Sequence, residues 1–378
     1  MKPLINTQEF LALSSFLNYQ LAGEPVNWQG ILNILFEEPL DEDSEEFLTQ
    51  ALEYLGEGYG QQKRRLGPLA ILHPIRAAAL LAKVQVRPNT LDLLTALLHD
   101  KDEDLTVDHY SPEDWQLLEK RYGRLLEKID SNANWFLNER IAFLAKEEGQ
   151  KYTDYLGRLL EHAKETPELA AIKLADRLDN TLDLRIDLHD ITDKSHSFQI
   201  IFDILFANSY QGLKLPKPHP ISRKINGSMR LYQLYKNAVF LSMLRSENIL
   251  LGEDAGKLFY SLAVAGIREA QTIMLHIFAY HLRDPAIQRV ILLEAMEYSH
   301  RGGFEHISEE GGSALDGIFR KYFVHESPEI KKSNLAALYQ DKKLMGLVAV
   351  AFLIIFANFI NNDEYLIKGI SSDGIIPV

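Results

Sequence analysis

Hydrophobic residues recur at three- and four-residue steps along most of this 378-residue chain. In residues 90–100, TLDLLTALLHD, the side chains of Leu94, Leu97 and Leu98 form one stripe, and residues 157–180 show similar steps. That spacing puts apolar side chains on one face of an α-helix. Alternating strand patterns bounded by Asn-Gly or Asp-Gly turns are scarce. The pattern therefore predicts an all-α protein.

A cluster of prolines marks the best domain boundary in the helical pattern. Residues 212–227, GLKLPKPHPISRKING, hold three prolines within five residues. Proline has no backbone N–H and resists helix, so this segment is expected to be an extended connector. The chain is also long for one hydrophobic core. We therefore expect a domain over residues 1–211 that includes an N-terminal helical extension, a linker over 212–227, and a helical accessory domain over 228–378.

One apolar run, residues 344–360, LMGLVAVAFLIIFANFI, has to be weighed as a membrane span. Lys342 and Lys343 precede it, as they do at many spans, but it contains Asn358 and is shorter than the roughly 20 apolar residues that a span usually needs. We expect a helix packed inside the C-terminal domain or between subunits of a homo-oligomer. The start of the chain lacks the basic-then-apolar order of a secretory signal.

Composition narrows the choice of partners. The formal net charge of −13 argues against general binding to nucleic acid or to an anionic membrane, because the mean field repels phosphate. An anionic substrate would need a local basic patch or a bound cation. The chain has no cysteine, which rules out disulfides, thiolate metal sites and thiol catalysis and fits a cytoplasmic location.

The first candidate site residues lie at the ends of two predicted helices. Pro74 suits the first turn of a helix, which would leave His73 at the cap with its imidazole free, although most His-Pro pairs only mark a helix start. His99 and Asp100 end the next helix, in ALLHDKDED. A second His-Asp pair, at residues 189–190, follows no comparable apolar helix and is interpreted as a surface pair.

Acidic residues crowd the turn after His99. Glu103 lies four residues after His99 and Asp104 four after Asp100, so each pair shares a helix face. Carboxylates this close repel one another unless water or a cation neutralises them. The segment is therefore either a solvated helix end or the beginning of a metal site.

A further carboxylate falls on an apolar helix face. In ELAAIKLADRLDN, Asp176 follows Leu169 and Ile172 at helical steps, and Asn180 lies one turn later. A buried carboxylate is costly unless it is paired, hydrogen-bonded or bound to a metal, so a salt bridge to Arg177 or another arginine is the alternative to a metal. The set of nitrogen and oxygen donors without sulfur suits manganese, iron or zinc.

The order H…HD…D resembles the HD-domain metal-dependent phosphohydrolases, and more narrowly the hydrolase domain of the RelA/SpoT alarmone enzymes and their small hydrolase-only relatives. ALLHDKDED and IKLADRLDN carry most of the resemblance, and GPLAILHP matches a third family segment less closely. What the resemblance implies is an HD-domain helical bundle that uses one divalent ion, usually Mn²⁺, to remove the 3′-pyrophosphate from guanosine tetra- or pentaphosphate. The residues that it implies are the metal ligands His73, His99, Asp100 and Asp176, the water-activating pair Glu103 and Asp104, and the nucleotide contacts Arg64, Arg65 and Asn180.

Departures from the family pattern leave the substrate open. Asp179 replaces a histidine, and Leu182 and Asp183 stand where the family often has arginine and threonine. KRR, residues 63–65, could anchor a polyphosphate, although such clusters are usually solvated. Two alternatives therefore remain, a phosphohydrolase for another nucleotide or dinucleotide and a non-catalytic nucleotide sensor.

Overall fold

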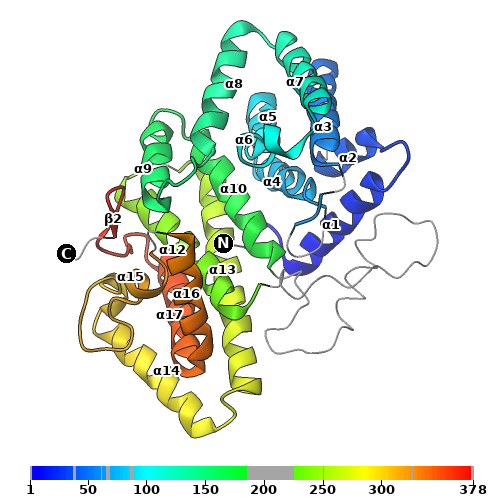
Figure 1. The fold of residues 1–378 in the computed structure, drawn as a ribbon. Helices are drawn as coiled ribbons and strands as arrows, with labels where there is room; N and C mark the ends of the chain where they lie inside the picture. The colour runs from blue at the N-terminus through cyan, green and yellow to red at the C-terminus, as the bar shows by residue number, and fades with distance from the viewer. Residues whose placement is uncertain are drawn as a thin grey trace, which may run out of the picture.

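Helices build almost all of the chain in the computed structural model (Figure 1). The structure describes residues 2–36, 40–60, 62–64, 69–85, 89–184, 225–249, 251–324 and 327–375. Within these ranges the strands are β1, Ile370–Ser371, and β2, Gly374–Ile375, which pair antiparallel in a short hairpin near the C-terminus. The prediction of an all-α protein is confirmed.

The first half of the chain forms a bundle of short and medium helices. Polar residues set where several of them begin: the side chains of Asn6, Asp41 and Asn89 accept hydrogen bonds from the first-turn backbone N–H groups of α1, α3 and α5. The elements are α1 Thr7–Leu21, α2 Trp28–Leu35, α3 Glu42–Tyr59, α4 Leu72–Ala82, α5 Thr90–Leu98, α6 Lys101–Asp104, the 3-10 turn η1 Val107–His109, α7 Pro112–Glu127, α8 Ser131–Leu144, α9 Tyr152–Ala163 and α10 Glu168–Asp183.

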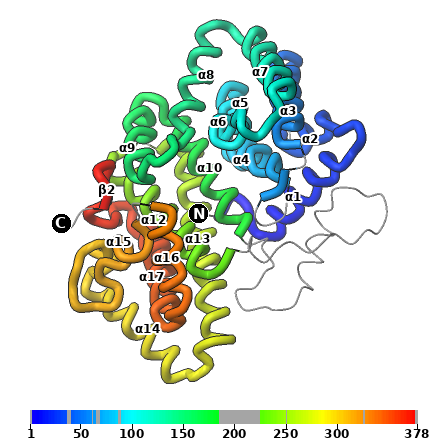
Figure 2. The backbone as a smooth tube through the Cα atoms, in the orientation of Figure 1, coloured from blue at the N-terminus to red at the C-terminus, as the bar shows by residue number. Residues whose placement is uncertain are grey.

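The second half continues with helices that include the longest in the protein's described part. They are α12 Gly227–Ser246, α13 Glu253–Tyr280, α14 Pro285–His300, the 3-10 turn η3 Gly303–Glu305, α15 Ile318–Tyr322, α16 Pro328–Gln340 and α17 Lys342–Asn361. Helix α10 lies between the two halves: it packs against α4, α5 and α9 and also against α13 (Figure 2). This places one face of α10 toward each half of the chain.

The apolar run at residues 344–360 lies in α17. By length and composition this helix could cross a membrane, but in the fold it packs against α12, α13, α14 and α16. Contact with α13 is close at Gly266, where a Cβ atom would come within 2.8 Å of the Phe356 ring. Eleven residues of α17 are buried, as expected for a core helix.

Part of the expected linker cannot be compared with the structure. Residues 185–224, which include the second His-Asp pair and most of the segment 212–227, lie outside the described residues. Helix α12 begins at Gly227, where the Asn226 side chain accepts from the Met229 N–H. Buried residues from both halves join in one hydrophobic core, and the division into two domains stays a prediction.

Candidate functional site

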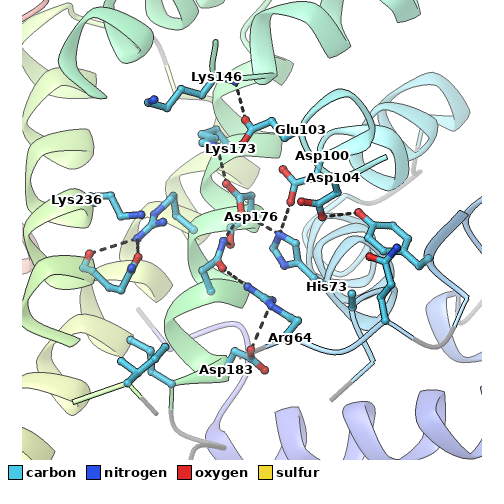
Figure 3. Close-up of a pocket in the computed structure, with 18 of the residues that line it drawn as sticks. Arg64, His73, Asp100, Glu103, Asp104, Lys146, Lys173, Asp176, Asp183 and Lys236 are labelled. Carbon is cyan, nitrogen blue, oxygen red and sulfur yellow. Dashed lines mark hydrogen bonds and ion pairs between the residues drawn. The ribbon is translucent and has the colours of Figure 1, made fainter. Parts of the chain in front are cut away.

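A polar pocket of about 580 Å³ opens between the halves of the chain (Figure 3). Its walls come from α4, α6, α9, α10 and α12 together with the segment at residues 62–64. Seven of the predicted site residues line it, and His99 lies buried behind them. The seven are Arg64, His73, Asp100, Glu103, Asp104, Asp176 and Asn180.

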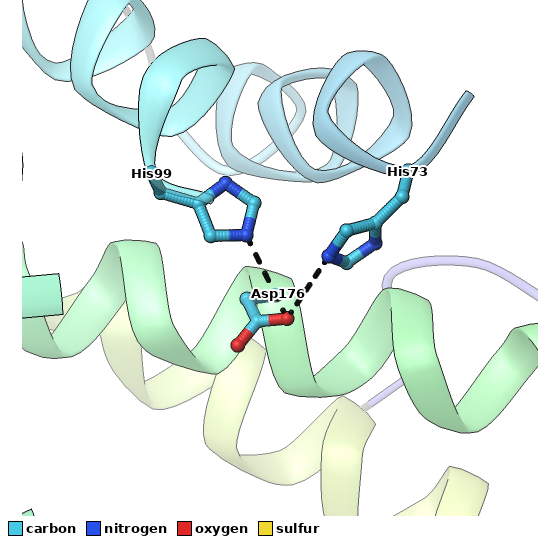
Figure 4. Close-up of side chains that lie close together, drawn as sticks. All are labelled: His73, His99 and Asp176. Carbon is cyan, nitrogen blue, oxygen red and sulfur yellow. Dashed lines mark ion pairs between the residues drawn. The ribbon is translucent and has the colours of Figure 1, made fainter. Parts of the chain in front are cut away.

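Two imidazoles and two carboxylates converge at the inner end of this pocket. Figure 4 shows three of these side chains, those of His73, His99 and Asp176. His73 Nε2 lies 3.1 Å from Asp100 Oδ2 and 3.3 Å from Asp176 Oδ1. His99 Nε2 lies 3.2 Å from Asp100 Oδ1 and 3.8 Å from Asp176 Oδ1. One donor atom each from His73, His99 and Asp176 fits within a 4.8 Å span, which is compatible with an HD-type metal site. We call His73, His99, Asp100 and Asp176 the HD cluster.

Helix ends bring the HD cluster together. His99 is the C-cap of α5 and Asp100 the N-cap of α6, while Asp176 lies in the middle of α10. The sequence predicted His73 at a cap, but α4 begins one residue earlier, and the His73 N–H donates to the Ala70 carbonyl at 3.1 Å. His73 therefore lies in the first turn of its helix, and Pro74 still occupies a first-turn position where no N–H is needed.

In their neutral forms the two imidazoles would each present an Nε2 lone pair to the same point. His99 Nδ1 lies 2.8 Å from the Ala96 carbonyl, which can only accept, so this nitrogen carries the proton. His99 Nε2 is buried and has no hydrogen-bond partner in the described part of the chain. His73 Nδ1 donates to Asp179 Oδ2 at 2.6 Å. Metal-binding histidines are oriented in this way in other proteins, so the donor set fits a divalent cation.

Electrostatics at the HD cluster favour a positive charge between its members. Burial lowers the pKa of the His99 imidazole, but the adjacent Asp100 and Asp176 carboxylates outweigh burial and raise it to about 9. Burial raises the pKa of Asp176, but Lys173 and the two imidazoles outweigh it and hold that pKa well below its usual range. A divalent cation would supply the same positive charge and replace the imidazole protons.

The buried partner of Asp176 is a lysine. Lys173 Nζ lies 2.7 Å from Asp176 Oδ2, whereas Arg177, the partner weighed from the sequence, points to Asn237 on α12. Lys173 received no role from the sequence, although its position three residues before Asp176 on one helix was a usable signal.

Asp179, one of the departures from the family pattern, is the centre of a buried ion-pair network. It is fully buried and accepts from His73, from Arg76 Nε at 2.7 Å and from Arg76 Nη2 at 3.1 Å. Asp183 pairs with the same guanidinium at 2.9 Å. Arg64 lies 3.4 Å from Asp179 and 3.5 Å from Asp183. Through Asp179, the network therefore connects His73, whose ring it orients, with Arg64 at the edge of the pocket.

The acidic pair after the HD cluster lies on α6 and faces the pocket. Glu103 Oε1 accepts from the Lys146 backbone N–H at 2.6 Å, and Asp104 Oδ2 accepts from the Tyr59 hydroxyl at 2.8 Å. Both side chains are reached by solvent through the pocket, yet desolvation by the surrounding protein raises the pKa of each. A raised carboxyl pKa suits a general base near neutral pH.

Asn180 and Arg64 bind each other beside the HD cluster. Arg64 Nη2 donates to Asn180 Oδ1 at 2.6 Å, and the Asn180 amide donates to the Asp176 side chain. Arg65 lies outside the described residues. The sequence did not indicate the pocket lysines Lys146 and Lys236, because neither belongs to a motif near the HD cluster.

Comparison with known proteins gives relatives of one kind. No family model matches the chain. It is 29% identical over 156 residues to the guanosine-3′,5′-bis(diphosphate) 3′-pyrophosphohydrolase of Aquifex aeolicus, which is 39% of this chain and 20% of that protein. It is 26% identical over 207 residues to the bifunctional (p)ppGpp synthase/hydrolase SpoT of Escherichia coli K12, which is 48% of this chain and 28% of that protein. These relatives bear out the resemblance of part of this chain to the RelA/SpoT-type hydrolases.

Proposed function

We propose that this protein is a divalent-metal-dependent phosphohydrolase that removes the 3′-pyrophosphate from guanosine 3′,5′-bis-pyrophosphate. The observation that carries the proposal is the HD cluster at the end of a pocket, where the buried Nε2 of His99 has no hydrogen bond to any residue that the structure describes. The names of the matched relatives support the substrate, although the matches span only 20% to 28% of their lengths. Mn²⁺ is the proposed ion, and His73, His99, Asp100 and Asp176 are its proposed ligands.

The proposed reaction divides the work among the pocket residues. A divalent ion in the HD cluster would lower the pKa of water and offset charge on a phosphoryl oxygen. Glu103 would take the proton as the water oxygen attacks phosphorus, and Asp104 would orient that water. The bond from phosphorus to the ribose 3′ oxygen would break, and the proton that Glu103 took from the water would pass to this leaving oxygen. Arg64 and Arg65 would contact the nucleotide, and Asn180 the ribose.

A second candidate is an HD phosphohydrolase for another nucleotide or dinucleotide. The observation that favours it is the ion pairing of Arg64 with Asp179 and Asp183, two positions at which the chain departs from the family pattern. These acidic partners hold the guanidinium that would otherwise be free for nucleotide, so the base or sugar contacts could differ. A cytoplasmic location belongs to both versions of the proposal.

The test is a substrate screen with the purified full-length protein and Mn²⁺. Guanosine 3′,5′-bis-pyrophosphate, 5′-nucleotides and dinucleotides are incubated separately, and products are separated by ion-exchange chromatography. We expect pyrophosphate and the 5′-diphosphate from the first substrate, and no product with excess EDTA or with Asp176→Asn. Turnover of a different nucleotide would favour the second candidate. If no nucleotide is hydrolysed with Mn²⁺, Zn²⁺ or Fe²⁺, the proposal of an enzyme is refuted and the non-catalytic nucleotide sensor is the alternative that stands.

A further inference from the structure

The second half of the chain contributes a wall to the pocket. Met229, Gln233 and Lys236 line it from α12, across from the α4 side that carries His73 (Figure 3). Helix α12 is held there by contacts with α9 and α10. The pocket is therefore complete only when residues from both halves are present.

Arg177 of α10 is a buried cation beside this wall, and it has no carboxylate partner among the described residues. Only 4% of its surface is exposed. Its Nε and Nη2 donate to Asn237 Oδ1 at 2.9 and 2.6 Å, and Nη2 also donates to the Gln233 carbonyl at 3.3 Å. These acceptors are neutral, so they orient the guanidinium without cancelling its charge. A buried charge without a counter-ion costs free energy, and a bound anion would offset that cost.

Lys236 places a second basic group beside Arg177, and an anion bound there would favour its charged form. Its Nζ lies 5.8 Å from the ring centre of Tyr152 and 5.5 Å from that of Tyr232, and within the described ranges it forms no ion pair with a carboxylate. Burial, with Arg177 and Lys331 nearby, lowers the pKa of Lys236 well below its usual range. Aromatic faces attract a cation weakly and cannot replace a counter-ion.

This wall is basic, whereas the protein as a whole is acidic. The chain carries a net charge of −13, and two cations close to the HD cluster are already paired, Lys173 with Asp176 and Arg64 with Asp179 and Asp183. Two basic side chains that have no carboxylate partner in the described part of an acidic protein are expected where a ligand supplies the negative charge. Because both line the same pocket as the HD cluster, that ligand would share the pocket with the reacting group.

We propose that Arg177 and Lys236 form an anion subsite that binds a phosphate or pyrophosphate group other than the one being cleaved. The inference rests on the proposed function for the identity of this group, which would be the second anionic group of the substrate. It predicts that Arg177 and Lys236, and not the HD cluster, distinguish nucleotides with two separate phosphate-bearing positions from nucleotides with one. It also gives the C-terminal half a role in binding substrate.

The test compares Lys236→Met with Lys332→Met, a matched control on α16 whose lysine is exposed and outside the pocket. Inorganic phosphate and inorganic pyrophosphate are titrated separately into the full-length protein by calorimetry, first with Mn²⁺ bound and then with EDTA. We expect Lys236→Met to raise the Kd for the tighter of the two anions at least about tenfold under both conditions, as for the loss of one charged contact. Lys332→Met should leave the Kd unchanged.

Thermal unfolding of the ligand-free variants separates binding from a structural role. Replacing a buried amine that has no carboxylate partner among the described residues with an apolar side chain should leave the Tm of Lys236→Met equal to that of the wild type or raise it. A lower Tm with an unchanged Kd, or no binding of either anion to the wild type, would overturn the subsite. If the substrate screen fails while Lys236→Met still loses anion binding, the proposed function is wrong and the subsite stands.

Discussion

Replacing Asp179 with asparagine tests whether the buried network holds a metal ligand in place. The carboxylate accepts hydrogen bonds from His73 and twice from Arg76, at 2.6 to 3.1 Å, and is fully buried. An asparagine amide has one acceptor oxygen, so its NH₂ group would face a donor of either His73 or Arg76. The substitution therefore leaves the Arg76 guanidinium with Asp183 as its remaining carboxylate.

The expected cost follows from that geometry. Removing one partner of a buried ion pair typically destabilises a protein by about 3–5 kcal/mol. Because Asp183 still pairs with Arg76 at 2.9 Å, we expect a loss near the lower end, about 3 kcal/mol. His73 also loses the acceptor that orients its ring, and such a loss typically weakens metal binding about 10- to 100-fold.

The assay measures these two effects separately. Urea unfolding gives the change in stability, and competition with a chelating dye gives the affinity for Mn²⁺. Asp183→Asn is the matched control, because it removes a carboxylate from Arg76 and leaves the His73–Asp179 hydrogen bond. We expect both variants to lose stability and only Asp179→Asn to lose metal affinity. Wild-type unfolding and wild-type metal affinity in Asp179→Asn would refute the reasoning, and equal loss of affinity in both variants would limit the network to a role in folding.

Three further predictions concern the site and the core. Glu103→Gln should retain Mn²⁺ and lose about 10²- to 10⁴-fold in kcat, whereas Asp176→Asn should lose metal and activity together. Elemental analysis beside a rate assay measures both effects, and wild-type metal content in Asp176→Asn would contradict its role as a ligand. Arg64→Ala should raise KM for the guanosine substrate more than it lowers kcat, and unchanged kinetics would remove it from the binding site. Gly266→Ala should destabilise the protein by about 1–3 kcal/mol, because the new methyl group would clash with an aromatic ring of α17. Gly256→Ala is the control, since its position on the same helix faces open space and should tolerate the methyl group. Thermal melting curves of both variants check this, and equal Tm values would contradict it.

The amino-acid sequence by itself was sufficient for the helical class and for the candidate metal ligands. Periodic leucines such as Leu94, Leu97 and Leu98 lie in α5 and are buried, because helical spacing of apolar residues is a local property that the sequence shows directly. His99, Asp100 and Asp176 belong to continuous motifs and could be chosen without coordinates. The chain also indicated that a carboxylate on the apolar face of α10 needs a partner.

Which groups actually meet was decided only by the tertiary structure. Asp176 pairs with Lys173 while Arg177 turns to Asn237, although both cations are close to Asp176 in sequence. Helical spacing tells which residues share a face, but the direction of a long flexible side chain depends on the helix packed opposite it. The packing of α10 against a helix from each half determines these directions.

The same reason explains the residues that sequence reasoning missed. Asp179 was visible only as a departure from a pattern, and its role became clear when Arg76 and His73 were found around it, more than 100 positions earlier in the chain. Lys236 lies on α12, 60 positions after Asp176, and has no motif of its own. Contacts over such separations depend on how whole helices dock, which the local pattern of hydrophobic and polar residues does not specify.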